Sequence, residues 1–308
     1  MRVLVTGGSG FIGSYLIPRL LESGVDVVVF DLAPAPKPLA ALVDRITYVR
    51  GDLASPPDLY RAMLTYRPEG VIHLGAILAG PCEENPMMGF RVNFLSTQTL
   101  LDASLALKVN RFLMVSSIAV FGRDVQEPVP DGAVKSPETV YGQTKLASEH
   151  LMLWYARKHG LDTRGLRFTW VFGPGRTQGI TAVYSSFILD AMARGEPISI
   201  PNPDERGDWL YVKDAVKAIM TLWNAPQPRQ RIYNIAGGAH SIGEVVEIAR
   251  KVCPEASIIL QEGGKSLSPY PAACDDAAAR REINWEPDYT IEAAVREHIG
   301  IVSAIVKR

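Results

Sequence analysis

A cluster of glycines near the amino terminus constrains this chain more than any other feature. Gly7, Gly10 and Gly13 lie between an apolar run at 3–5 and a segment with helical spacing. Glycine permits a tight turn and a close approach of helix to strand, and the first N–H groups of the helix then lie free to bind a phosphate. The pattern predicts a phosphate-binding strand–turn–helix unit, with a tight turn that binds nothing as the alternative.

A second run of β-branched residues, 25–30, ends at Asp31, 18 residues after Gly13. An acidic side chain at about that spacing accepts hydrogen bonds from the adenosine ribose of a dinucleotide, and its charge repels a 2′-phosphate. No arginine directly follows Asp31. These observations favour NAD over NADP, with a simple strand-end turn residue as the alternative for Asp31.

Strand-like and helical segments alternate through the first half of the chain. Further apolar runs lie at 46–50, 70–74, 111–116 and 163–172. Near-continuous apolar strands separated by helices are typical of a buried parallel sheet. With right-handed crossovers, this predicts an α/β fold with a Rossmann-like, doubly wound parallel sheet. After Gly173 the alternation becomes irregular, and the runs at 208–212 and 231–236 could return to the main sheet.

We predict two lobes within the 308 residues, a length that accommodates a large core. Residues 1–172 plus about 208–240 would form the NAD-binding Rossmann domain. Residues 173–207 plus 241–308 would form a smaller, C-terminal substrate-binding lobe.

The composition argues against several classes of partner. Lys plus Arg number 32 and Asp plus Glu number 33, so no excess charge points to nucleic acid or to an anionic membrane. The three cysteines and five histidines are scattered without ligand spacing, so no metal site is expected. No signal pattern follows Met1 and no apolar run is long enough to span a membrane. We expect a cytoplasmic protein that acts on a small molecule.

Tyr141 and Lys145 stand four residues apart at the start of a predicted helix, so their side chains share one face. A nearby ammonium lowers the pKa of a phenol, ordinarily near 10, and makes tyrosine usable as a general base. Ser116 and Ser117 follow a strand whose carboxyl end is where such sheets bind ligands. Ser117 could bind the reacting oxygen, with strand-end capping as the alternative for either serine. The tyrosine–lysine spacing alone also arises by chance.

Several further motifs occur in a fixed order along nearly the whole chain. They are TGGSGFIG (6–13), the strand-end Asp31, RGDL (50–53), HLGA (73–76), VN (92–93), SSIAVFG (116–122), YGQTK (141–145) and RGDWLYVKDA (206–215). Together they resemble those of an extended short-chain dehydrogenase/reductase of the NAD-dependent epimerase/dehydratase family.

The resemblance implies an NAD-dependent oxidoreductase in which Ser117, Tyr141 and Lys145 form the catalytic triad. The cofactor-binding residues that it implies are Gly7, Gly10, Phe11, Ile12, Gly13, Asp31, Asp52, Leu53, Gly75, Ala76, Asn93, Tyr141 and Lys145. Members of the family usually form homodimers through two helices per subunit, here about 93–107 and 141–158.

The substrate is less constrained. Nucleotide-sugar epimerases of the family usually have asparagine where this chain has Trp170, and an arginine in a stretch comparable to 266–273, which has none. Arg206 matches an arginine that binds the substrate diphosphate in that group. An ion pair of Arg206 with Asp204 or Asp208 is the alternative.

Other stretches, such as GAIL (75–78) and ENP (84–86), resemble the short-chain-type L-threonine 3-dehydrogenases. Ala79 stands where that group has a substrate-contacting serine, and the loop 175–181 differs from its substrate loop. Arg176 in this loop is a candidate anion-binding residue, with an ordinary exposed loop charge as the alternative.

The sequence therefore predicts hydride transfer between NAD and a secondary hydroxyl of a sugar or small hydroxy acid. Trp170, Arg176 and Arg206 are the candidate substrate-binding residues. The alternatives are a UDP-sugar 4-epimerase that recycles its NAD and a catalytically silent NAD-sensing protein. The presence of both Tyr141 and Lys145 disfavours the last.

Overall fold

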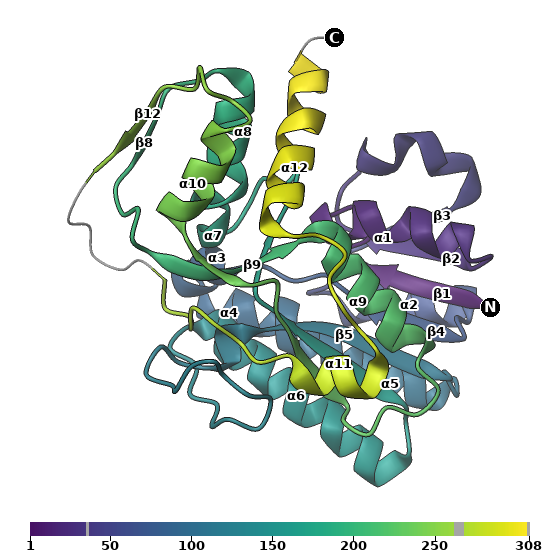
Figure 1. Ribbon diagram of the computed structural model, residues 1–308. Helices are drawn as coiled ribbons and strands as arrows, with labels where there is room; N and C mark the ends of the chain where they lie inside the picture. Colours follow the sequence, from purple (N-terminus) through teal and green to yellow (C-terminus); the bar gives the residue numbers. More distant parts are fainter. Residues whose placement is uncertain (35–36, 262–267, 307–308) are drawn as a thin grey trace.

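Seven parallel strands in the order β10-β6-β5-β4-β1-β2-β3 form the main sheet of the computed structural model (Figure 1). The structure describes residues 1–34, 37–261 and 268–306. The strands are β1 (Arg2–Thr6), β2 (Asp26–Asp31), β3 (Thr47–Arg50), β4 (Gly70–His73), β5 (Arg111–Ser117), β6 (Thr163–Phe168) and β10 (Ile232–Ile235). The strand order reverses between β1 and β4, and ligands bind outside the carboxyl ends of strands at such a point. The predicted Rossmann-like sheet is confirmed.

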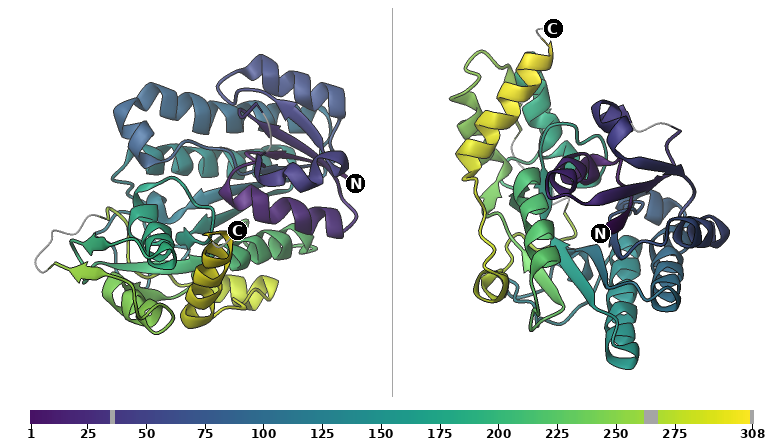
Figure 2. Two further views of the ribbon diagram at one scale, coloured as in Figure 1. Left: turned by 90° about the horizontal axis from the view of Figure 1, so that it is seen from above. Right: turned by 90° about the vertical axis from the view of Figure 1, so that its right-hand side faces the viewer.

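Helices cover both faces of this sheet (Figures 1 and 2). α1 (Phe11–Glu22) packs against α9 (Val212–Asn224) on one face. The helices of the other face are α2 (Pro56–Tyr66), α5 (Ser96–Ala106) and α6 (Val140–His159). Successive strand side chains point to opposite faces, so Val3 joins one apolar cluster and Leu4 the other. Burial on both faces explains the near-continuous apolar strands.

Short helical segments occupy several connections. They are η1 (Lys37–Arg45), α3 (Ala79–Glu84), α4 (Pro86–Gly89), η2 (Phe90–Leu95) and η3 (Ile118–Val120).

The apolar run 163–172 forms two strands, and the prediction of a single strand was wrong. After β6, β7 (Trp170–Phe172) leaves the main sheet and pairs with β9 (Arg206–Tyr211), which also pairs with β11 (Ala239–Ser241). An apolar run indicates that its residues are buried, but it does not show where the chain passes from one sheet to another. For the same reason β9 does not return to the main sheet, whereas β10 does.

A group of helices from the second half of the chain gathers away from the main sheet (Figure 1). α12 (Ile291–Val306) packs against α8 (Ser186–Arg194) and α10 (Ile242–Arg250), next to the strand pair β8 (Ile198–Ile200) and β12 (Ile258–Leu260). The remaining helices are α7 (Ile180–Val183) and α11 (Ala277–Ile283). The exact division into two lobes stays a prediction. Within the described residues, none of the helices is long and apolar enough to cross a membrane.

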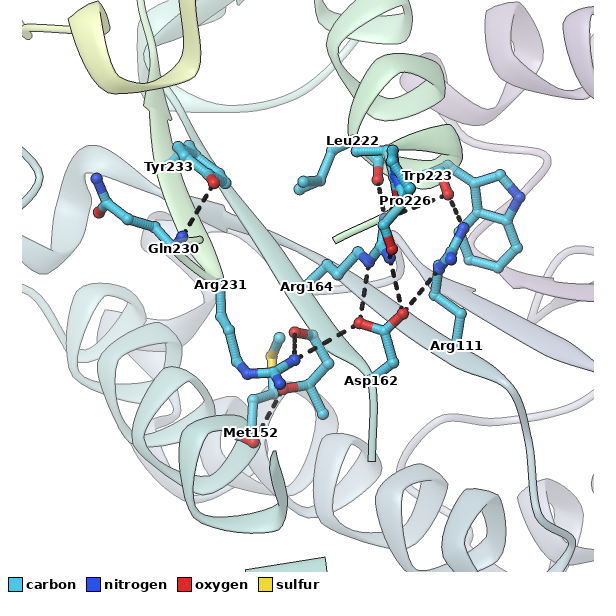
Figure 3. Close-up of polar contacts among 12 residues, drawn as sticks. Arg111, Met152, Asp162, Arg164, Leu222, Trp223, Pro226, Gln230, Arg231 and Tyr233 are labelled. Atoms are coloured by element: carbon cyan, nitrogen blue, oxygen red, sulfur yellow. Dashed lines mark hydrogen bonds and ion pairs between the residues drawn. The ribbon is translucent and has the colours of Figure 1, made fainter. Parts of the chain in front are cut away.

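Three arginines surround one carboxylate at the amino ends of β5, β6 and β10 (Figure 3). Asp162 accepts hydrogen bonds from Arg111 Nε at 3.0 Å and Arg164 Nη2 at 2.8 Å, and Arg231 Nη1 lies 3.5 Å from it. Arg164 also donates to the carbonyl of Ala225 at 2.6 Å, where α9 ends. We call these four charged residues the amino-edge cluster. It ties three strands to the last turn of a helix, where carbonyls lack intrahelical partners.

Candidate active site

A cleft of about 790 Å³ opens at the opposite edge of the main sheet, at the carboxyl ends of its strands. Most of the predicted site residues line it. They are Gly7, Gly10, Phe11, Ile12, Gly13, Asp31, Asp52, Leu53, Gly75, Ala76, Ser117, Tyr141, Trp170 and Arg176. Asn93, Lys145 and Arg206 are not part of its wall.

The glycine turn has the shape that a diphosphate requires. Gly7 has a φ of +66°, and a Cβ there would lie 2.6 Å from the Cα of Gly75. A Cβ on Gly13 would lie 2.3 Å from the carbonyl oxygen of Gly8. Side chains at these positions would force the loops apart and lift α1 from the turn. No side chain caps α1 at Gly10, so its first N–H groups and their partial positive charge remain available to an anion.

Asp31 is held at the edge of the cleft by the backbone. Its two carboxylate oxygens accept hydrogen bonds from the Ser9 N–H at 3.0 Å and the Ala33 N–H at 3.2 Å. The Tyr48 hydroxyl donates to the Ala33 carbonyl at 2.7 Å and so steadies the same loop. The carboxylate next to the glycine turn fits the ribose and diphosphate of NAD.

Tyr141 reaches the end of β5 because the next residue is glycine. A Cβ on Gly142 would lie 2.1 Å from the carbonyl oxygen of Ala119, so only glycine lets α6 approach so closely. The Thr139 hydroxyl caps α6 by accepting from the Gly142 N–H at 3.0 Å. Ser117 accepts from the Ala119 N–H at 3.1 Å and hydrogen-bonds to Tyr141, so it caps a turn and faces the cleft at once. Sequence reasoning missed Gly142, although it lies inside the YGQTK motif.

The Tyr141 phenol is hard to ionise in this setting. Burial is the largest influence on its pKa and raises it above the usual value, and Tyr270 raises it further. The hydrogen bond from Ser117 and the charge of Arg176 lower the pKa. The phenol therefore keeps its proton at neutral pH until a further positive charge is brought near.

Lys145 lies behind Tyr141. Its Nζ is 5.7 Å from the centre of the Tyr141 ring and donates to the Val115 carbonyl at 2.8 Å. Burial lowers the pKa of Lys145 to about 8, while Cys82 and Glu149 oppose the change. The side chain is thus a desolvated amine next to the reacting tyrosine, bonded to a neutral acceptor.

Two of the polar residues that the sequence singled out hold the walls of the cleft in place. Asn93 accepts from the Ile77 N–H at 2.9 Å and donates to the Ile77 carbonyl at 3.0 Å and to the Thr144 hydroxyl at 3.1 Å. It fastens the loop after β4 to α6. Ser116 donates to the buried Glu149 at 2.6 Å. A cofactor contact of Asn93 stays a prediction.

The loop after β7 carries Arg176 into the cleft. The guanidinium donates through Nε to the Gln178 carbonyl at 3.2 Å, through Nη2 to the Thr181 hydroxyl at 2.7 Å, and through Nη1 to the Val171 carbonyl. Burial lowers the pKa of Arg176 to about 10. All three acceptors are neutral, so the positive charge stays uncompensated within the described residues.

Tyr270 is the cleft residue that sequence reasoning overlooked. It comes from the C-terminal part of the chain, lines the cleft and hydrogen-bonds to the hydroxyl of Thr139. Burial raises the pKa of Tyr270 to about 12. Its phenol interacts electrostatically with Tyr141 and Arg176. No local motif marks it, because only the tertiary fold brings it to α6.

Trp170 contributes to the cleft wall, but most of its indole is packed inside the protein. The side chain is 2% exposed, and a Cβ on Gly207 would lie 2.4 Å from its ring. The ring also packs against Trp209. A contact of Trp170 with substrate stays a prediction.

Arg206 lies at the exposed start of β9 and donates to the Ala239 carbonyl at 3.4 Å. Among the described residues, it forms no ion pair with either Asp204 or Asp208. The stretch 266–273, compared above with an arginine-bearing loop, lies partly outside the described residues, because these resume at Ser268.

Comparison with known proteins relates the whole chain to one group. A sequence profile of the NAD dependent epimerase/dehydratase family matches residues 3–236. A UDP-glucose 4-epimerase from Corynebacterium glutamicum is 27% identical over 100% of this chain and 98% of its own length. A D-erythronate dehydrogenase from Haemophilus influenzae is 29% identical over 83% of this chain and 84% of its own. The solved structure of an L-threonine dehydrogenase from Cupriavidus necator, in its holo form, is 26% identical, with a TM-score of 0.88 over 99% of this chain and 100% of that one.

Proposed function

The chain belongs to the NAD-dependent epimerase/dehydratase family and is an NAD-dependent enzyme, and we propose that it is a dehydrogenase acting on a secondary hydroxyl of a sugar or small hydroxy acid. One observation carries the proposal. The hydroxyls of Ser117 and Tyr141 share the cleft with the glycine turn, and Lys145 lies directly behind the tyrosine.

Ser117 and Tyr141 would act together on the substrate hydroxyl. The Ala119 N–H occupies one lone pair of the Ser117 oxygen and fixes its position. The Ser117 proton, which is shared with Tyr141 in this structure, would then turn to the reacting oxygen when substrate binds between the two hydroxyls. Tyr141 would accept the proton of the substrate hydroxyl, and Lys145 would stabilise the phenolate by its charge. When bound, NAD supplies the hydride acceptor and a positive ring charge. The glycine turn and Asp31 would hold its diphosphate and adenosine ribose.

The features expected for a nucleotide sugar are poorly represented in the cleft. Arg206 lies outside the cleft wall, and the position usually taken by asparagine in nucleotide-sugar epimerases carries the packed indole of Trp170. Two relatives act, by their names, on erythronate and threonine, which are small acids. UDP-sugar 4-epimerisation is the second candidate, favoured by the full-length similarity to UDP-glucose 4-epimerases.

Product analysis separates the two candidates. Purified protein is incubated with NAD and either small hydroxy acids, free sugars or UDP-glucose. A dehydrogenase accumulates NADH in proportion to the substrate oxidised. Isomerisation of UDP-glucose without net NADH would contradict the proposal and establish the epimerase.

We also propose that the protein is a cytoplasmic homodimer joined through α5 and α6. Trp154 on α6 is 45% exposed although it is a large aromatic residue, which supports a contact surface there. The three cysteines are all free thiols, as is usual in a reducing compartment. Light scattering of the wild type and of Trp154→Glu tests the dimer, because a buried carboxylate should produce a monomer. A wild-type monomer would overturn this part of the proposal.

A further inference from the structure

We propose that Arg176, assisted by Tyr270, forms a carboxylate subsite beside Tyr141, so that the enzyme selects small hydroxy acids over neutral sugars and alcohols. This inference rests on the proposed dehydrogenase function and specifies its substrate class.

Arg176 differs from every other arginine that the structure describes. Each of the others either has a carboxylate oxygen within 4.0 Å or is exposed to solvent. Arg176 is partly buried, and no carboxylate among the described residues lies within that distance. Removing a charge from water without a counter-ion costs free energy. An unpaired guanidinium at a ligand cleft is therefore best explained by an anion that arrives with the ligand.

The hydrogen bonds of Arg176 leave room for a two-point contact. A guanidinium has five N–H donors. The carbonyls of Gln178 and Val171 and the hydroxyl of Thr181 take three of them, which fixes the group in place. Two N–H donors have no acceptor among the described residues. Two is the number that a carboxylate engages in a bidentate pair.

The loop geometry holds this guanidinium against the wall of the cleft. Gly179 has a φ of +101°, and a Cβ there would lie 3.0 Å both from Arg176 Nη2 and from Leu78 Cδ1. The loop can therefore close against Leu78 only because residue 179 is glycine. Arg176 lines the same cleft as Tyr141 and Tyr270, and its charge acts on both phenols.

Tyr270 closes the other side of the subsite. Its hydroxyl is bonded to Thr139, the N-cap residue of α6 two residues before Tyr141. Tyr270 lines the same cleft as Tyr141 and Arg176 and interacts electrostatically with both. A phenol adds a neutral donor without competing for the guanidinium. A bound carboxylate would thus receive charge-assisted hydrogen bonds from Arg176 and one hydrogen bond from Tyr270, with the substrate hydroxyl left at Tyr141.

The test compares acids with their amides, which keep the shape and lose the charge. Wild type, Arg176→Met and Arg176→Lys are assayed by NADH formation on D-erythronate, D-threonate and L-threonine, each beside its amide. Arg229→Met, at an exposed arginine that does not line the cleft, is the matched control. We expect wild type to favour at least one acid over its amide by about 100-fold in kcat/KM, the effect of a charged hydrogen-bonded pair. Arg176→Met should abolish that preference by slowing the acid, Arg176→Lys should keep part of it, and the control should keep all of it.

Three outcomes separate the possible failures. Equal rates on acids and amides in wild type would overturn the subsite and leave the dehydrogenase intact. A loss of NAD affinity in Arg176→Met, with the preference for acids retained, would assign the guanidinium to the cofactor diphosphate. If no compound yields NADH, the proposed function fails on these substrates. The subsite is then tested by titrating the same acids into the complex of the protein with NADH and measuring their binding by calorimetry. Acids that bind wild type but not Arg176→Met support it, and equal or absent binding to both overturns it.

Discussion

Positively charged side chains have different partners at the two edges of the main sheet. At the amino edge, Arg111 and Arg164 share the carboxylate of Asp162, and Arg164 also binds the end of α9 (Figure 3). At the carboxyl edge, Lys145 and Arg176 are also partly or fully buried, but they bind only neutral oxygens. Paired charges hold the scaffold together, whereas unpaired ones cost stability and remain free to act on a ligand.

The pKa values of the two edges reflect this difference. Burial raises the pKa of Asp162, but the hydrogen bonds and charges of Arg164 and Arg111 outweigh it and hold the pKa below its usual range. The amino-edge cluster therefore stabilises the fold above about pH 4 and loses that contribution as the pH falls further. At the cleft, the charged forms are disfavoured instead of stabilised, because burial lowers the pKa of both Lys145 and Arg176.

The largest expected effect is that of Tyr141→Phe at the carboxyl edge. Loss of the phenol hydroxyl removes the proton acceptor, and kcat should fall by about 10³-fold or more. NAD affinity and the midpoint of thermal unfolding should stay nearly unchanged, because the hydroxyl hydrogen-bonds to Ser117 at the cleft and to no element of the sheet scaffold among the described residues. Steady-state kinetics, NADH titration and calorimetry measure the three quantities.

Tyr155→Phe is the matched control for that variant. Tyr155 lies on the same helix, but its hydroxyl binds Asp102, away from the cleft. The activity of Tyr155→Phe per folded molecule should stay near that of the wild type. Turnover that survives Tyr141→Phe would remove the tyrosine from the mechanism.

Arg164→Met should have the second largest effect, and on stability alone. The side chain is 1% exposed and binds both Asp162 and the last carbonyls of α9, so its loss leaves buried acceptors and part of a charge without partners. The free energy of unfolding should fall by about 3 kcal/mol. Urea denaturation measures this change, while kcat at a temperature well below unfolding should stay unchanged.

Arg231→Met provides the comparison within the cluster. Arg231 is 38% exposed and lies 3.5 Å from Asp162, so its loss should cost less than about 1 kcal/mol. Equal losses in the two variants would mean that burial does not decide the contribution of each arginine.

Local sequence patterns at the carboxyl edge are most informative where the backbone itself requires a particular residue. The positive φ of Gly7 and the close packing at Gly13 leave a signature that can be read from neighbouring residues. The spacing of Tyr141 and Lys145 could be read from the helical repeat. The resemblance did not indicate the structural role of Asn93, which fastens the loop after β4 to α6, and its cofactor contact stays a prediction.

Long-range placement could not be predicted. The apolar run 163–172 gave no sign that the chain changes sheets after β6. Buried strands are rich in apolar residues in both sheets, so the composition does not change where the chain passes from one to the other. Tyr270 had no motif, since it meets α6 only through the C-terminal part of the fold. The amino-edge cluster was equally invisible, because Asp162 and Arg231 come together only when β6 and β10 pair.

The two edges can also be compared within a single strand, because β2 has an aspartate at each end. Asp31→Asn changes the one at the carboxyl end. Loss of the negative charge at the carboxyl end weakens the ribose contact and removes the repulsion of a 2′-phosphate. We expect the affinity for NADH to fall by roughly 10- to 30-fold, and the ratio of the affinities for NADH and NADPH to become smaller. Fluorescence titration with both cofactors measures this.

Asp26→Asn is its counterpart at the amino end of β2. Asp26 pairs with Arg2 at 2.7 Å, and both side chains are about half exposed. This variant should lose at most about 0.5 kcal/mol of stability and no cofactor affinity. An unchanged preference for NADH in Asp31→Asn would show that Asp31 does not discriminate between the cofactors.

Lys145→Met should change stability less than Arg164→Met does, and in the opposite direction. The pKa of Lys145 in the folded protein, about 8, lies below the value of roughly 10.4 for an exposed lysine. Between these values the unfolded chain binds more protons, so this residue makes the wild type more stable as the pH rises through that window. At pH 7 the wild-type protein carries the whole free-energy cost of burying this charge. Removing the charge relieves that cost but also loses the hydrogen bond to Val115, so the variant should be more stable by about 1–2 kcal/mol.

That gain should shrink as the pH approaches 10, because the native lysine is then already neutral. Urea denaturation at pH 7 and pH 9.5 measures the trend, with the exposed Lys251→Met as control, which should show no gain at either pH. Catalysis should be lost in Lys145→Met while stability rises. A variant that is less stable at pH 7 would show that Lys145 belongs with the paired charges of the amino edge, and the contrast between the two edges would then rest on Arg176 alone.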